Sequence, residues 1–172
     1  MRVSRTTTVA EIDSALRKLG AGNHEDNMQV LASFPHHFFL ELSEKDFFEL
    51  VFLQCREVAE ICPSGADRTL HAVAYRAVHS PKRQLGPNWD LDQVNHRTEE
   101  VLCTSTSSVS PLFLRDARHS EKAFGCWYLQ DGSHRALGYA MAILTDRTRY
   151  SPLNAFCATT DELARIDGGP NG

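Results

Sequence analysis

The sequence has 172 residues, of which 42% are hydrophobic and 23% are charged, and its formal net charge is −4. These values are typical of one soluble globular domain, or of one domain with an extension. No apolar stretch reaches the roughly 18 to 20 residues that a membrane span needs, and the first residues lack the apolar core of a secretory signal. We therefore expect a cytoplasmic protein without a membrane span.

The charges are unevenly distributed along the chain. Residues 1–67 contain 6 basic and 11 acidic side chains, for a net charge of −5, whereas residues 68–150 contain 11 and 8, for a net charge of +3. The positive excess is compatible with a phosphate-bearing ligand in the second segment. A protein that relies on a long contact with nucleic-acid phosphates would normally be more basic.

The five cysteines include no C-x-x-C pair, and most of them stand among apolar residues. A structural zinc site needs closely paired ligands, so this spacing disfavours zinc. We expect the cysteines to be small, buried thiols in a reducing compartment.

The first elements of the chain carry clear helix signals. Thr8 and Glu11 form a capping-box pattern, apolar residues follow at helical spacing, and Gly20 is placed to end the helix. A second short helix is expected over residues 26–33, ahead of Pro35.

A third helix is expected over residues 44–61, because Ser43 opens another capping-box pattern before a long apolar run. The run is apolar almost all round, which is typical of a helix that is central in the core or covered by a partner. The breaker Cys-Pro-Ser-Gly at residues 62–65 ends it. Residues 1–65 are therefore expected to form a helical N-terminal subdomain.

The pattern changes after residue 65. Residues 70–78 (LHAVAYRAV) alternate and contain β-formers, which predicts a strand. The elements expected next are a helix, two strands, a helix and a last strand, over about residues 90–103, 112–114, 124–130, 133–144 and 153–158. Residues 66–160 are thus predicted to be an α+β domain, and residues 161–172 a helical turn with a flexible tail.

A strand is expected to end, and a helix to begin, at the sequence DGSHR of residues 131–135. The N-terminus of a helix presents backbone N–H groups that, with the helix dipole, favour an anion. Gly132 permits a positive φ, Ser133 can cap the helix or contact a phosphate, and His134 and Arg135 add donors. The alternative is that the polar residues are only caps and an exposed first turn.

Asp131 needs a separate explanation, because a carboxylate is unusual in an anion site. It can hold a divalent cation, orient the neighbouring Arg or His, or cap the turn. The sequence leaves these three roles open.

The motif and its surroundings resemble the ParB/sulfiredoxin superfamily, in which an apolar strand ends in a D-G-x-H-R or G-G-C-H-R turn that opens a helix. The resemblance extends over roughly residues 70–158. Segments similar to the family's first strand, first helix, P-I-x-V strand and closing strand are residues 75–81, 89–102, 110–114 and 150–156. It implies a ParB/sulfiredoxin-like small mixed sheet with helices, here preceded by the helical subdomain.

In this superfamily the turn binds the phosphates of ATP, of another nucleotide or of a nucleic-acid backbone. Carried over to this sequence, the resemblance implies phosphate contacts at Asp131, Gly132, Ser133, His134 and Arg135. Ser133 stands where sulfiredoxins have their catalytic cysteine. A hydroxyl of ordinary pKa is a poor replacement for a thiolate, so sulfinic-acid reduction is not expected.

The first helix of the family supplies further contacts. An ungapped match places Gln93, His96 and Glu100 where sulfiredoxins have a Lys, a Ser and a Thr that contact the nucleotide. His96 is therefore a candidate nucleotide contact. The gain of a carboxylate suggests that Glu100 acts as a base, or holds Mg²⁺ together with Asp131. The alternative for Glu100 is an ordinary solvated carboxylate.

Three basic residues are the candidate DNA contacts. Lys82 and Arg83 lie in the loop after the expected strand, where ligands of the family approach, and Arg97 lies on the helix that follows. A solvated loop is the alternative for the first two.

The length, the helical addition and the variant turn together resemble the small plasmid-encoded fertility-inhibition proteins that act in oncogenic suppression. This resemblance implies an ATPase and DNA nuclease that blocks DNA transfer through a type IV secretion (conjugation) system, with Glu100, His134 and Arg135 as catalytic residues and ATP and DNA as ligands. Two alternatives stay open. One is a non-catalytic inhibitor that binds a secretion-system component, such as the coupling component. The other is a partition-type DNA-binding protein, which the net acidity disfavours.

Overall fold

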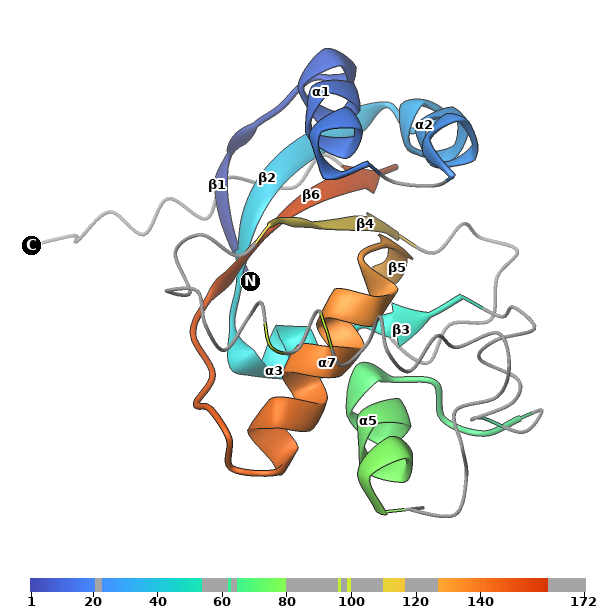
Figure 1. The fold of residues 1–172 in the computed structure, drawn as a ribbon. Coiled ribbons are helices and arrows are strands. Elements are labelled where there is room, and N and C mark those ends of the chain that lie inside the picture. The colour runs from blue at the N-terminus through green and yellow to red at the C-terminus, as the bar shows by residue number, and fades with distance from the viewer. Residues whose placement is uncertain are drawn as a thin grey trace, which may run out of the picture.

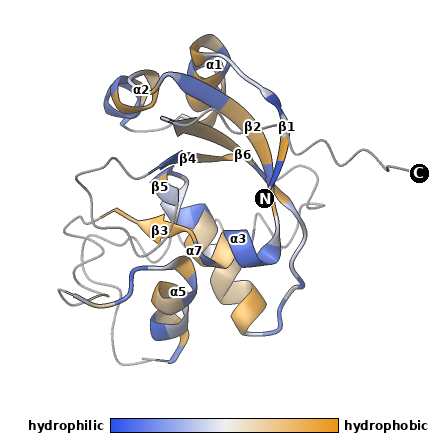
Figure 2. Ribbon diagram, turned by 180° about the vertical axis from the view of Figure 1, so that it is seen from behind, coloured by the Kyte–Doolittle hydropathy of each residue, from blue (hydrophilic) through white to orange (hydrophobic). Residues whose placement is uncertain are grey.

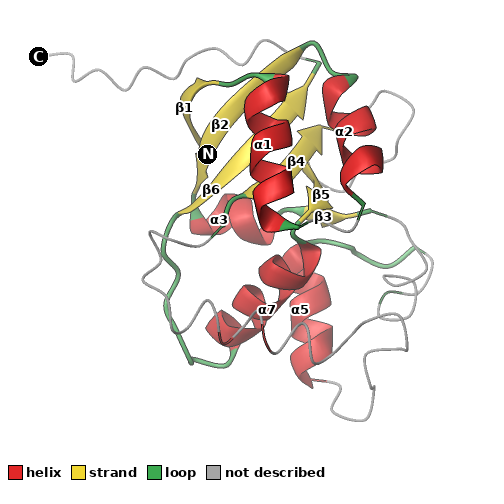
Figure 3. Ribbon diagram, turned by 45° about the horizontal axis from the view of Figure 1, so that its top comes forward, coloured by secondary structure: helices red, strands yellow, loops and turns green. Residues whose placement is uncertain are grey.

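The computed structural model describes residues 1–20, 23–53, 62, 65–79, 96, 99, 110–116 and 127–160. Within these residues the chain forms five helices and one six-stranded mixed sheet. Helices α1 (Val9–Leu19) and α2 (His24–Ala32) cover one face of the sheet, as Figure 3 shows. Helices α3 (Glu44–Phe48), α5 (Leu70–His79) and α7 (Ser133–Leu144) lie on the other side of it (Figure 1).

The sheet combines strands from both ends of the chain. Its order is β1-β2-β6-β4-β5-β3, and the strands are Arg2–Thr6 (β1), His36–Leu42 (β2), Val51–Phe52 (β3), Leu112–Asp116 (β4), Trp127–Asp131 (β5) and Leu153–Thr159 (β6). The pairs β4–β6 and β3–β5 are parallel, and the other neighbours are antiparallel. The mixed α+β class expected from the sequence is confirmed.

Two apolar cores follow from the alternation of side chains along the central strands. In β4, Leu112 and Leu114 join the core beneath α3, α5 and α7, whereas Phe113 joins the core beneath α1 and α2. In β6, Cys157 joins the core beneath α3, α5 and α7, whereas Phe156 joins the core beneath α1 and α2. Figure 2 shows the hydrophobic residues of β3 and of the middle of α7 on the side of the larger core. Because both faces are covered, every residue of β4 is buried.

The predicted helix ends are confirmed where the signals are local. Thr8 and Glu11 form the expected capping box of α1, and Gly20 ends that helix in the left-handed conformation, with a φ of 62°. Ser43 and Asp46 form a second capping box at α3. The predicted secondary structure is also found over residues 112–114, 133–144 and 153–158. The strand predicted over residues 124–130 is described from residue 127, where β5 begins.

The strand predicted over residues 70–78 is wrong, because this segment is the helix α5. The buried residues Leu70, Val73 and Ala74 follow the helical spacing i, i+3, i+4. The stretch also contains three alanines, which have the highest helix propensity. Residues 75–79, which resemble the first strand of the superfamily, are therefore helical.

The helix predicted over residues 44–61 is also wrong, because it ends at Phe48 and β3 follows. Of the apolar run that suggested a buried helix, Phe47 and Phe48 lie in α3, whereas Val51 and Phe52 form a buried strand. Val51 pairs with Tyr128 and Phe52 pairs with Leu129 in β5. An apolar run without polar interruptions is compatible with a buried helix or a buried strand, and pairing with β5 makes it a strand here. Residues 54–61 lie outside the described part of the chain.

Residues 1–65 are not solely helical, which corrects the expected helical subdomain. They contribute β1, β2 and β3 to the sheet, and β2 pairs with β6 along its full length, from His36 opposite Thr159 to Leu42 opposite Leu153. The sheet therefore joins residues on both sides of position 65. Of the helix predicted over residues 90–103, only His96 and Glu99 are described, and both are helical. Residues 161–172 lie outside the description.

None of the helices in the described ranges has the length and apolarity needed to cross a lipid bilayer.

We expect Thr8→Ala to lower the free energy of unfolding by about 1 kcal/mol, because it removes the hydroxyl that accepts a hydrogen bond from the backbone N–H of Glu11. Urea denaturation measures this loss. Ser14→Ala, at an exposed position inside the same helix, is the control and should cost nothing. Equal stability of both variants would show that the capping box does not stabilise α1.

Candidate functional site

The DGSHR turn has the predicted strand–turn–helix geometry. Strand β5 ends at Asp131, Gly132 adopts a φ of 91° and a ψ of 17°, and α7 begins at Ser133 (Figure 1). All five residues from 131 to 135 are partly exposed. The turn is neither part of a continuous helix nor enclosed in the interior.

Gly132 is required by both its conformation and its surroundings. A Cβ atom added there would lie 2.8 Å from Leu112 Cδ2 and 2.9 Å from Arg135 Nη2. Both distances are shorter than a normal van der Waals contact. The backbone of the turn therefore lies directly against β4 on one side and against the Arg135 guanidinium on the other.

No side chain caps the N-terminus of α7. Ser133 is the first helical residue and not the cap, and the first helical hydrogen bond runs from the Ala136 N–H to the Gly132 carbonyl, at 2.9 Å. The first turn of α7 also contains no acidic residue. The first turn of α7 thus has neither a capping hydroxyl nor a carboxylate of its own, which suits an external anion. The Asp131 carboxylate lies just before this turn, where it accepts a hydrogen bond from the Gly132 N–H.

Asp131 holds Arg135 in place. Its Oδ1 lies 3.6 Å from Arg135 Nη2, and its Oδ2 accepts a hydrogen bond of 2.8 Å from Asn27 Nδ2. Burial raises the pKa of Asp131, and Arg135 and Asn27 oppose this rise because they stabilise the charged form. Of the three roles that the sequence left open, the geometry favours the orientation of the arginine.

Arg135 is mostly buried, with 12% of its side chain exposed. Its guanidinium folds back along the turn, toward Asp131 and over Gly132, and does not extend into solvent. The arginine predicted as a phosphate clamp is therefore already engaged with a carboxylate in this structure.

Asn27 is a site residue that the sequence did not identify. It lies on α2, is 5% exposed, and connects two residues of β5: it donates to Asp131 and accepts a 3.0 Å hydrogen bond from Gln130 Nε2. Gln130 in turn accepts from Arg115 Nε of β4, also at 3.0 Å. The only sequence signal was a polar residue four positions before Leu31 on the buried face of a helix.

A second polar cluster lies where β4 and β6 end. Asp116 is 9% exposed, and its Oδ2 accepts hydrogen bonds from the Thr159 hydroxyl and from the backbone N–H and hydroxyl of Thr160. Arg115, whose guanidinium carbon lies 5.0 Å from the centre of the Tyr128 ring, donates to the Asp116 carbonyl at 3.3 Å. The two clusters are joined through Arg115 and Gln130, so one polar chain links α2, β5, β4 and β6.

The structure brings together only part of the predicted site. Residues 131–135 form one local group, and His96 is exposed on a helical segment. The remaining candidates, which are Glu100, Lys82, Arg83 and Arg97, lie outside the described residues, and their roles stay predictions.

Of the two predicted metal ligands, Asp131 and Glu100, the structure describes only Asp131. Among the described residues, no group of three or more His, Cys, Asp or Glu side chains is placed to hold a metal ion. Asp131, the candidate ligand that is described, is hydrogen-bonded to Asn27 and lies beside the cationic Arg135, which opposes the binding of a second cation.

Cys62 and Cys157 are free and buried, as expected. Burial raises the pKa of both thiols. Neither is therefore a reactive thiolate at neutral pH. Cys55, Cys103 and Cys126 are not among the described residues.

Comparison with known proteins gives no match: no known protein family, no curated protein and no solved structure is significantly similar to this chain.

We expect Gly132→Ala to lower the free energy of unfolding by about 2 kcal/mol or more, because the alanine would need both a positive φ and displacement of Leu112 and Arg135. Gly20→Ala is the matched control: Gly20 also has a positive φ, but an added Cβ meets nothing within 4 Å. Chemical denaturation should give a clearly larger loss for Gly132→Ala. An equal loss would show that the close contacts at the turn are not restrictive.

Asp131→Asn should change how stability depends on pH. Since burial raises the pKa of Asp131 above its ordinary 3.8 in the folded state, folding favours the protonated carboxyl. This contribution is fully present below the ordinary pKa and is lost as the pH rises through the raised value. Asparagine keeps an oxygen that can accept from Asn27 and does not titrate.

Denaturation of both proteins from about pH 3 to pH 7 tests the direction of this pH dependence of stability. The stability of the wild type relative to Asp131→Asn should fall as the pH rises. A relative stability that increases with pH would mean that the Arg135 ion pair outweighs burial.

Proposed function

We propose that this protein binds phosphate groups at the N-terminus of α7 and hydrolyses phosphate bonds there, as an ATPase and DNA nuclease. The observation that supports this most directly is the turn from β5 through Gly132 into α7, whose first helical turn has no capping side chain and no acidic residue. Backbone N–H groups at such a position are a general solution for phosphate binding.

The partly exposed residues of the turn have distinct roles in this proposal. The N–H groups of the first turn and the Ser133 hydroxyl contact phosphate oxygens. His134, which follows on the same turn, orients the attacking water or accepts its proton. Glu100 is the alternative base, and its role rests on the sequence alone.

Arg135 can contact the phosphate only after an exchange of partners. Its guanidinium lies 3.6 Å from the Asp131 carboxylate, and a phosphate would offer it oxygens of the same charge with a geometry that suits a bidentate contact. Until a phosphate binds, the guanidinium of Arg135 stays paired with the Asp131 carboxylate. Binding energy from the phosphate must therefore exceed the loss of this ion pair.

The biological role that we propose follows from the sequence resemblance. It is inhibition of DNA transfer through a type IV secretion system, with ATP and the transferred DNA as substrates. The succession β4, β5, α7 and β6 follows the order that the resemblance implies for residues 110–158, whereas the segment matched to the family's first strand is helical. The strand that carries the motif lies between β3 and β4.

Ser133 is a better test position than Arg135, because Arg135 is buried against Gly132 and its removal would disturb the turn. We expect Ser133→Asp to stabilise α7 by about 0.3–1 kcal/mol, since a carboxylate in the first turn interacts favourably with the helix dipole. The same carboxylate should repel phosphate and weaken ATP binding by about tenfold or more. Ser133→Asn, of nearly the same size but uncharged, is the control and should retain binding.

The readouts are thermal stability, ATP affinity by calorimetry, and release of phosphate and nicking of plasmid DNA with and without Mg²⁺. His134→Ala should retain ATP affinity while turnover falls about 100-fold or more. Unchanged ATP affinity and turnover in a folded Ser133→Asp protein would exclude the N-terminus of α7 as the phosphate site. ATP binding without any hydrolysis by the wild type would refute the enzymatic part of the proposal.

A further inference from the structure

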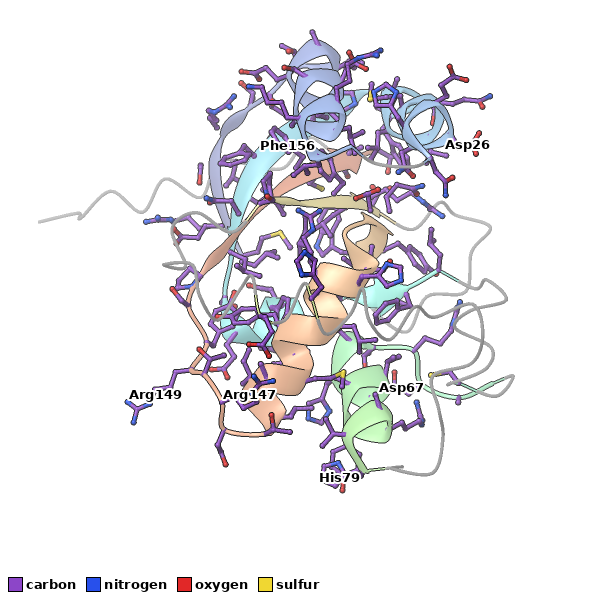
Figure 4. All side chains as sticks on the ribbon, viewed as in Figure 1. Asp26, Asp67, His79, Arg147, Arg149 and Phe156 are labelled. Atoms are coloured by element: carbon purple, nitrogen blue, oxygen red, sulfur yellow. The ribbon has the colours of Figure 1, made fainter. Side chains whose placement is uncertain are left out.

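Asn27 is a buried polar residue whose side-chain oxygen and nitrogen are both engaged next to the motif. It lies on α2 and is 5% exposed. Asp26, labelled in Figure 4, precedes it on the same helix and is exposed. The Asn27 side chain contacts two consecutive residues of β5, Gln130 and Asp131. An unpaired polar group at such a buried position would be costly, so these contacts define how the side chain lies.

The hydrogen bonds around Asn27 all run in one direction, toward Asp131. Arg115 has only donors, and its Nε donates to Gln130 Oε1 at 3.0 Å. Gln130 Nε2 then donates to Asn27 Oδ1, also at 3.0 Å, and Asn27 Nδ2 donates to Asp131 Oδ2 at 2.8 Å. The chain ends there, because an ionised carboxylate only accepts. A guanidinium at one end and a carboxylate at the other thus fix the orientation of both amides.

The charge of Asp131 is stabilised by several groups, one of which can leave. Burial raises the pKa of Asp131, whereas Arg135 lowers it most, followed by Asn27 and the Gly132 N–H. Arg135 lies 3.6 Å from Oδ1, and Asn27 bonds the other oxygen, Oδ2. The phosphate contact proposed above requires Arg135 to turn away from this carboxylate. The hydrogen bond from Asn27 can persist during that exchange, because it involves neither Oδ1 nor the guanidinium.

We propose that Asn27 is a positioning residue that holds the Asp131 carboxylate in place while Arg135 exchanges it for a phosphate. The inference rests on the proposed phosphate site and adds to it a residue of the N-terminal helices. Once Arg135 has turned away, Asp131 is a partly buried anion without its cation. A hydrogen bond to such a carboxylate is stronger than one to a carboxylate whose charge a cation shares. Asn27 therefore stabilises the phosphate-bound state more than the phosphate-free state.

Titration with inorganic phosphate at about pH 8, where phosphate carries mainly two charges, tests the inference. The ionic strength is held constant, and binding is followed by NMR through the backbone amide signals of Gly132 and Ser133. Asn27→Ala should weaken phosphate binding by about fivefold, because Asp131 then depends more strongly on Arg135. Gln29→Ala, at an exposed position of α2, is the control and should leave the affinity unchanged.

A double variant separates positioning from structural damage. Asp131→Asn alone should strengthen phosphate binding by about fivefold or more, since it removes the charge that competes for Arg135. In that background the side chain at position 131 is uncharged, so its hydrogen bond with Asn27 does not depend on where Arg135 lies. Adding Asn27→Ala to Asp131→Asn should therefore change phosphate affinity by less than about twofold. A residue that only attached α2 to the sheet would show no such dependence on Asp131.

The possible outcomes distinguish this inference from the proposed function. Equal phosphate affinity of Asn27→Ala and the wild type, or an equal loss in the Asp131→Asn background, would overturn the positioning role and leave the phosphate site standing. Asp131→Asn without any gain in affinity would do the same, and this variant leaves Asn27 in place. Amide signals of Gly132 and Ser133 that do not respond to phosphate in the wild type would overturn the phosphate site, and this inference with it.

Discussion

The positive φ of Gly132 is the constraint on which the site depends. It lets the chain turn from β5 directly into α7 while the backbone rests against Leu112 and the guanidinium of Arg135. Any other residue would be strained at this φ, and its Cβ atom would displace the side chains of Leu112 and Arg135. The orientation of α7, the position of its N-terminus and the Asp131–Arg135 pair therefore follow from one backbone conformation.

The polar chain that begins at Asp131 gives the N-terminal helices a part in this site. Asn27 of α2 bridges Asp131 and Gln130, and Gln130 accepts a hydrogen bond from Arg115 on the neighbouring strand. These side chains are mostly enclosed, where an unpaired polar group is costly. Movement of α2 relative to the sheet would thus break hydrogen bonds of the motif itself, so the two are mechanically coupled.

Structural features that depend on a few neighbouring residues could be predicted from the sequence. The capping boxes at Thr8 and Ser43 and the turn at Gly132 depend on local hydrogen bonds and on one special backbone conformation, and all three were predicted correctly. The predictions over residues 44–61 and 70–78 failed because apolar or alanine-rich runs are compatible with both the spacing of a helix and the alternation of a strand. Only tertiary packing chooses between them.

Asn27 illustrates the other limit of prediction from sequence. Its partner Asp131 is 104 residues away, and nothing in the local pattern of α2 specifies that contact. The same holds for β2, which pairs along its full length with the distant β6. Long-range pairings of this kind decide both the sheet order and the neighbours of the motif.

The position of β6 has a consequence for the order of folding. Among the described strands it comes last along the chain, yet it lies between β2 and β4 and pairs with both. During synthesis on the ribosome, the antiparallel pair β1–β2 and the group of β3, β4 and β5 can form separately, but no strand pairing among the described residues joins them into one sheet until residues 153–159 emerge. We therefore expect nascent chains to expose two unpaired strand edges, which are the surfaces that chaperones protect from aggregation.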